Sequence, residues 1–195
     1  VKEAQRRRIG VEKLAFYDEP ISFADGNAVP EGTPDEILAA GKKMYQELSP
    51  ETAEFIDFMF ENELFDVLSR DGKAPGGYCT EIADYKSPFI FSNFNATAGD
   101  VDVLTHEAGH AFEAYRAFKQ ELPSLLHSPT IEACECHSMS MEFLAWPWAE
   151  GFFGEDARKF RYSHLSGALT FIPYGTMVDH FQHIVFEKPD MTPRE

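Results

Sequence analysis

Two histidines and a glutamate lie close together at residues 106–110, in the order His106-Glu107-Ala108-Gly109-His110. In an α-helix, residues four positions apart are separated by about 40° around the axis, so His106 and His110 can reach the same metal ion. Glu107 points to a neighbouring face, where its carboxylate can accept a proton from a water molecule held by that ion. The pentapeptide therefore predicts a metal site with a general base beside it.

A third protein ligand is needed, because a catalytic zinc ion generally has three and leaves one position for water. The extended pattern with a third histidine on the same helix requires Gly at position 112 and His at position 116. The sequence has Phe112 and Arg116 there, which excludes that pattern. The third ligand is therefore expected on another segment, and a carboxylate on a following helix is the best candidate.

Three acidic residues of the segment 131–144 are candidates for this role. Glu132, Glu135 and Glu142 fall on one helical face of a segment otherwise rich in Met, Phe and Trp. A carboxylate in apolar surroundings needs a partner, and a divalent cation is a strong one. We favour Glu135 as the ligand, with Glu132 or Glu142 as the residue that supports a ligand histidine.

The elements that must position these residues are expected to be mainly α-helical. Thr33-Pro34 and Ser49-Pro50 each combine an N-cap hydroxyl with proline at the first helical position. The first helix is expected to end near Leu48, and the second to carry an apolar stripe of Phe55, Met59, Leu64, Phe65 and Leu68. Further helices are expected from Asp100 or Asp102 through His110, from Ser128 through Glu142, and over most of 155–187, with breaks at Gly167 and Pro173.

The rest of the chain is expected to be loop, with one strand. Residues Ser87–Phe94 have a β-like composition, and Pro88 near the start suits an edge strand better than a central one. Gly76-Gly77-Tyr78 either lines a cleft or forms a tight turn. Residues 1–33 are interpreted as an extended connecting segment and residues 34–195 as a helical metal-binding core.

Composition excludes several classes of protein. The 195 residues are 44% hydrophobic, which excludes a disordered chain. A formal charge of −16 argues against binding to nucleic acid or to an anionic membrane surface. The three cysteines do not form a disulfide framework, which favours the reducing cytoplasm, and neither a signal peptide nor a membrane-spanning run is recognised.

Two segments resemble a known family. LTHEAGHAFEAY (104–115) and IEACECHSMSMEFLAWPW (131–148) resemble the thimet oligopeptidase and oligoendopeptidase F family of zinc metallopeptidases, most closely its oligoendopeptidase F and Pz-peptidase-like branch. The resemblance extends to GGYCT, SPFIFSNFNAT and FIPYGTMVDHFQHIVFE. In this family the third zinc ligand is a glutamate 29 positions after the first histidine, which is Glu135 rather than Glu132.

The resemblance implies a zincin-like helical catalytic core with a short edge strand or hairpin beside the metal-binding helix. It implies one Zn²⁺ per chain on His106, His110 and Glu135, with Glu107 as general base in the hydrolysis of oligopeptides. The strand Phe89–Phe94 is expected to pair with the peptide backbone as an edge strand above the metal.

Family members are roughly three times this length, so residues 1–195 are interpreted as part of a catalytic domain. Histidine and tyrosine residues that stabilise the oxyanion are expected beyond residue 195. The alternative is a metal- or peptide-binding fragment with weak or no activity, whose partners include a second copy of itself or the remainder of the chain. A further alternative is that His106 and His110 have a purely structural role.

Overall fold

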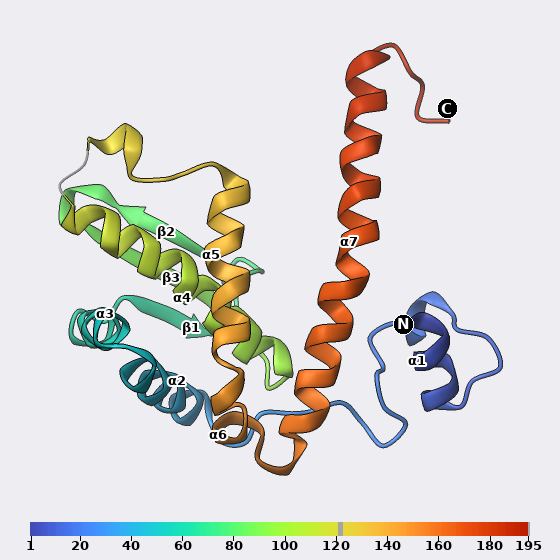
Figure 1. Ribbon diagram of the computed structural model, residues 1–195, viewed down its shortest axis with the longest axis horizontal. Coiled ribbons are helices and arrows are strands. Elements are labelled where there is room, and N and C mark those ends of the chain that lie inside the picture. The colour runs from blue at the N-terminus through green and yellow to red at the C-terminus, as the bar shows by residue number, and fades with distance from the viewer. Residues whose placement is uncertain (121–122, 195) are drawn as a thin grey trace. The chain divides into compact units, whose positions relative to one another are not determined.

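The computed structural model describes residues 1–120 and 123–194, and the chain forms two compact units. The larger unit, residues 28–157, contains every residue of the predicted metal site. Its elements are α2 (Pro34–Leu48), α3 (Pro50–Glu61), β1 (Phe65–Leu68), β2 (Tyr78–Ile82), β3 (Ser87–Phe94), α4 (Ala98–Lys119), α5 (Ile131–Leu144) and the short α6 (Glu150–Phe153). The prediction of a mainly helical fold with little strand is confirmed (Figure 1).

Helices α2 and α3 begin where the capping residues predict. The Thr33 hydroxyl accepts the backbone N–H of Glu36, whose carboxylate accepts the N–H of Thr33 in return. The Ser49 hydroxyl caps α3 by accepting the N–H of Thr52. Helix α3 ends earlier than the apolar stripe suggested, because Glu63 has a left-handed φ of 52° that stops the helix. The stripe prediction is therefore wrong beyond Met59.

The three strands form one sheet in the order β1-β3-β2, so the prediction of Ser87–Phe94 as an edge strand is wrong. Strand β3 is central, parallel to β1 and antiparallel to β2. The N–H of Ile90 donates to Leu64 O on the β1 side, and alternate N–H groups of a strand point the same way. Position 88 also faces the β1 side, but β1 begins only opposite Ile90, where Phe65 makes the first pair. The N–H that Pro88 lacks therefore has no partner strand to bond, and proline is tolerated in a central strand there.

Helix α4 runs alongside this sheet and α5 packs against α4 (Figure 1). The core of the larger unit lies between the sheet, α4 and the α2–α3 pair, and includes the fully buried side chains of Met44, Tyr45, Phe55, Met59, Ile90 and Ala108. The Tyr45 hydroxyl donates to Thr105 O across this core at 3.2 Å. These contacts hold the helix that carries His106 and His110 against a rigid layer.

Helix α4 begins at Ala98, two residues before the earlier of the two predicted starts. The Asp100 carboxylate accepts the backbone N–H groups of Asn95 and Ala96 at 2.8–3.2 Å, so it caps the preceding turn from inside the first helical turn. Asp102 lies one turn into the helix and does not open it.

The smaller unit contains α1 (Lys2–Ile9) and α7 (Ala157–Glu187) from residue 158 onward. The Arg8 guanidinium lies over the ring of Tyr162 at 4.2 Å and over that of Phe23 at 4.9 Å. Two predictions are corrected here. Residues 1–33 are not wholly extended, since they include α1. Helix α7 continues through Gly167 and Pro173, so neither the flexibility of glycine nor the N–H that Pro173 lacks ends it.

Candidate metal centre

His106 and His110 project from the same face of α4, as their spacing predicts. Their ring centroids are 4.9 Å apart with an interplanar angle of 80°. The side chains are 27% and 20% exposed, so both rings are largely shielded by protein and still reachable from solvent. Burial, together with the neighbouring His106, lowers the pKa of His110, which favours the neutral ring that a metal ion requires.

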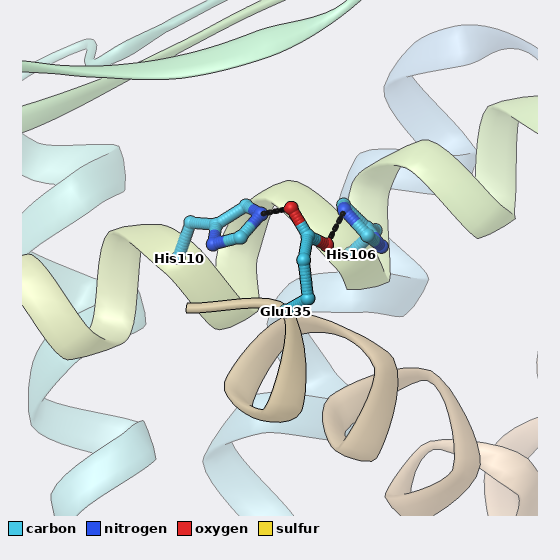
Figure 2. A group of neighbouring side chains, drawn as sticks. All are labelled: His106, His110 and Glu135. Atoms are coloured by element: carbon cyan, nitrogen blue, oxygen red, sulfur yellow. Dashed lines mark ion pairs between the residues drawn. The ribbon is translucent and has the colours of Figure 1, made fainter. Parts of the chain in front are cut away.

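Glu135 reaches this pair from α5, and Figure 2 shows its carboxylate between the two imidazole rings. Glu135 Oε2 is 3.3 Å from His106 Nε2, and Oε1 is 3.7 Å from His110 Nε2. One ligand atom from each of the three residues lies within 4.8 Å of the others. Ligands bound tetrahedrally at zinc distances lie about 3.3 Å apart, so the donor types and their spacing fit a divalent metal ion.

The structure distinguishes between the two candidates for the carboxylate that supports a ligand histidine. Glu142 Oε1 accepts a hydrogen bond from His106 Nδ1 at 2.6 Å, and this bond raises the pKa of His106. Glu132 is exposed, and its pKa is lowered by a hydrogen bond from its own backbone N–H and by the Thr130 side chain. The carboxylate that contacts a candidate ligand histidine is therefore Glu142, and its position leaves His106 Nε2 facing Glu135.

Glu107 lies on the side of α4 that faces β2 and is 8% exposed. Its pKa is raised by burial, against the opposing effects of His106 and of a hydrogen bond from the backbone N–H of Cys79. Cys79 lies in β2, whose other edge is paired with β3. The edge strand beside the metal-binding helix is thus β2, and not the segment Phe89–Phe94. Gly76 and Gly77 lead into this strand.

Other residues with reactive side chains lie around the three candidate ligands without joining them. Glu113, Cys136 and His137 line a neighbouring pocket of about 650 Å³ between α4 and α5. The Cys134 thiol is near Ser128 Oγ at 3.7 Å. Burial and the nearby Glu107 raise the pKa of the Cys79 thiol to about 12, which keeps it protonated. Among the described residues of the smaller unit, α7 carries His164, Tyr174, His180 and His183.

Two residues near the site were not singled out from the sequence. Ser138 is fully buried, and its hydroxyl contacts Glu135 Oε2 at 3.0 Å. Its spacing of three residues from Glu135, one turn along a helix, is the signal that could have pointed to it. The N–H of Cys79 that binds Glu107 had no such signal, because it depends on which strand lies beside α4.

Residues 48–195 match the family model described as Peptidase family M3. The chain belongs to peptidase family M3. The match includes all three candidate metal ligands, Glu107 and Glu142, so the membership predicted from the two helical segments is confirmed.

Three solved structures are closely similar to this M3 peptidase chain. One is a protein of Bacillus anthracis strain Ames provisionally named oligoendopeptidase F, with 58% identity and a TM-score of 0.94 over 98% of this chain and 35% of its own length. A second structure with the same provisional name has 61% identity and a TM-score of 0.94 over 98% of this chain and 34% of its own. Pz peptidase A with an inhibitor has 59% identity and a TM-score of 0.93, with the same coverage as the second.

This M3 peptidase chain therefore spans about a third of the length of the structures it matches. No curated protein sequence matched it. Within residues 1–120 and 123–194, none of the helices is both long enough and apolar enough to cross a membrane.

Proposed function

We propose that this chain is the metal-binding part of a zinc-dependent endopeptidase that hydrolyses oligopeptides. The observation that carries the proposal is the cluster of His106, His110 and Glu135, two imidazoles and one carboxylate whose ligand atoms lie within 4.8 Å of one another. Family membership supports it, as do the names oligoendopeptidase F and Pz peptidase A of the similar structures.

In this proposal His106 Nε2, His110 Nε2 and one oxygen of Glu135 hold the ion. A bound zinc would lower the pKa of a water molecule and polarise the carbonyl of the bond to be cleaved. Glu142 accepts a hydrogen bond from the Nδ1–H of His106, which leaves the Nε2 lone pair available to the ion. Ser138 donates to Glu135 and orients its carboxylate.

Glu107 is the proposed general base. It accepts a proton from the attacking water and delivers a proton to the leaving amine. Burial raises its pKa, which makes the carboxylate a better proton acceptor than a solvated one. The Cys79 N–H fixes the carboxylate toward β2 rather than toward solvent.

The free edge of β2 is the proposed place for the peptide backbone. Antiparallel pairing with β3 leaves alternate N–H and C=O groups of β2 directed away from the sheet. An extended peptide can pair with these groups other than the Cys79 N–H, which Glu107 accepts. Main-chain pairing reads the backbone more than the side chains. We therefore expect a broad sequence preference. Three free thiols suit a reducing environment, and a cytoplasmic location is part of the proposal.

The test compares the zinc-loaded parent with Glu107→Gln on an internally quenched oligopeptide. Gln has nearly the shape of Glu and is not a base, so the variant should keep its zinc and lose cleavage by roughly 10²–10⁴-fold. Equal cleavage by the two proteins would exclude Glu107 as the base. A zinc-loaded parent that binds the peptide and leaves it intact would instead support a binding fragment without turnover.

A further inference from the structure

Helices α4 and α5 are in close contact at Gly109, within the pentapeptide that carries both histidines. A Cβ atom placed on Gly109 would lie 2.6 Å from Ser138 Cα, 3.0 Å from His137 O and 3.2 Å from Met141 Cβ. Two of these three atoms belong to the backbone of α5. No side-chain rotation can relieve the contact, so a residue larger than glycine must push the helices apart.

This contact lies at the level of the candidate ligands. Gly109 immediately precedes His110, and Ser138 lies one helical turn after Glu135. Ser138 is completely buried, and its hydroxyl contacts Glu135 Oε2 at 3.0 Å, the oxygen that faces His106. The helix spacing at Gly109 and Ser138 therefore determines how far the Glu135 carboxylate reaches between the two rings in Figure 2.

The required displacement can be compared with the tolerance of a metal site. Ordinary van der Waals contact begins at 3.4 Å, whereas the added Cβ would stand 2.6 Å from Ser138 Cα. The helices would have to separate by about 0.8 Å, several times the ±0.2 Å within which metal–ligand distances are normally found. The displacement acts on Glu135 and leaves the spacing of His106 and His110 unchanged, because both belong to α4.

We infer that Gly109 is a positioning residue for the metal centre: its missing side chain sets the α4–α5 spacing at which Glu135 meets His106 and His110. Ser138 completes the arrangement by orienting the carboxylate. The consequence for the metal rests on the proposed function, whereas the consequence for the helix spacing does not. A purely structural role for Gly109 predicts a loss of stability with normal metal affinity in the molecules that remain folded.

The experiment measures Zn²⁺ affinity, by competition with a chromogenic chelator, for the parent, Gly109→Ala, Ser138→Ala and Gly167→Ala. Gly167 is the matched control, because it is also a helical glycine and an added Cβ there meets nothing within 4 Å. We expect folded Gly109→Ala, checked by circular dichroism, to bind zinc at least tenfold more weakly than the parent. Ser138→Ala should be weakened roughly tenfold and Gly167→Ala not at all.

Parent-like zinc affinity in folded Gly109→Ala would overturn the inference. Should Gly109→Ala fail to fold, parent-like affinity in Ser138→Ala would overturn it instead. Crystal structures of the metal-free parent and Gly109→Ala give a readout that needs no zinc, and unchanged spacing at Ser138 also overturns it. A parent that binds no zinc would contradict the proposed function, while wider spacing in the variant would still support the role of Gly109 in placing Glu135.

Discussion

At the scale of single residues, Glu142 is the partner on which the orientation of His106 depends. Its 2.6 Å hydrogen bond to Nδ1 and its low exposure of 15% make it a directional acceptor. Glu142→Ala should therefore weaken zinc binding by roughly 10–100-fold, measured by chelator competition. Glu132→Ala is the matched control on the same helix and should bind zinc like the parent. Equal losses in the two variants would contradict a specific role for Glu142.

A second residue-scale prediction concerns Asp66, which Arg70 contacts at 2.7 Å and the nearly fully buried Lys73 at 3.0 Å. Hydrogen bonds from Arg70, and then from Lys73, hold the pKa of Asp66 well below its ordinary value. A carboxyl with a lowered folded-state pKa stabilises the protein above its unfolded pKa of about 3.9 and loses that contribution as the pH falls.

Asp66→Asn should therefore lower the free energy of unfolding at pH 7 by about 1–3 kcal/mol. It should also make stability fall less steeply below pH 4 than in the parent, because the titrating group is gone. Urea unfolding between pH 3 and pH 7 measures both effects. Parallel pH dependence in the parent and the variant would show that Asp66 has no such role.

At the scale of elements, β2 is the strand proposed to pair with a peptide backbone. The Cys79 N–H points away from β3 toward Glu107, and alternation places the Glu81 N–H on the same edge. Glu81→Pro removes that N–H and leaves the β2–β3 hydrogen bonds in place, because the Glu81 N–H points away from β3. In a Glu107→Gln background, Glu81→Pro should weaken binding of a fluorescent oligopeptide roughly tenfold.

Glu81→Ala is the control for this substitution, because it removes the side chain and keeps the backbone N–H. Its peptide affinity should match that of the Glu107→Gln background. Equal affinity of the proline and alanine variants would rule out pairing along this edge. Zinc affinity, measured in parallel, should be the same in both variants.

Elements whose signals are local were predictable from the sequence, and those set by pairing partners were not. Thr33 and Ser49 mark the starts of α2 and α3 because a cap acts within one helical turn. The central position of β3 depends on β1, which comes from a segment that continues the apolar pattern of α3. The predicted apolar stripe of α3 was wrong beyond Met59 for the same reason, since Phe65 pairs with Ile90 instead of extending the helix.

The same distinction, between local signals and contacts with distant segments, applies to the candidate site. His106, Glu107 and His110 share one helix, so their relative placement follows from helical periodicity. Glu135 lies on another helix. The residues of 131–144 favoured it among three acids on one helical face, and the family resemblance then selected it over Glu132. The choice between Glu132 and Glu142 as supporting residue required the packing of α5 on α4, which depends on Gly109 and which no periodicity encodes.

At the scale of the whole molecule, many large apolar side chains are exposed to solvent. Within the smaller unit, α7 carries Leu169, Phe171, Ile172, Met177, Phe181 and Phe186 with 51–83% of each residue exposed. Exposed apolar patches of this kind promote association. We expect the chain to self-associate reversibly with rising concentration in analytical ultracentrifugation. An Ile172→Ser/Phe181→Ser variant should remain monomeric to higher concentration, whereas identical sedimentation of the two proteins would contradict this.

The most direct test of the metal centre is the zinc content of the purified chain, measured by inductively coupled plasma mass spectrometry after loading and removal of excess ion. Parent protein should carry one zinc per chain, Glu135→Ala should lose most of it, and Glu113→Ala should keep it, because Glu113 lines the neighbouring pocket and is not part of the cluster. A parent without stoichiometric zinc, or a Glu135→Ala variant that retains it as tightly as the parent, would contradict the assignment of His106, His110 and Glu135 as the metal ligands.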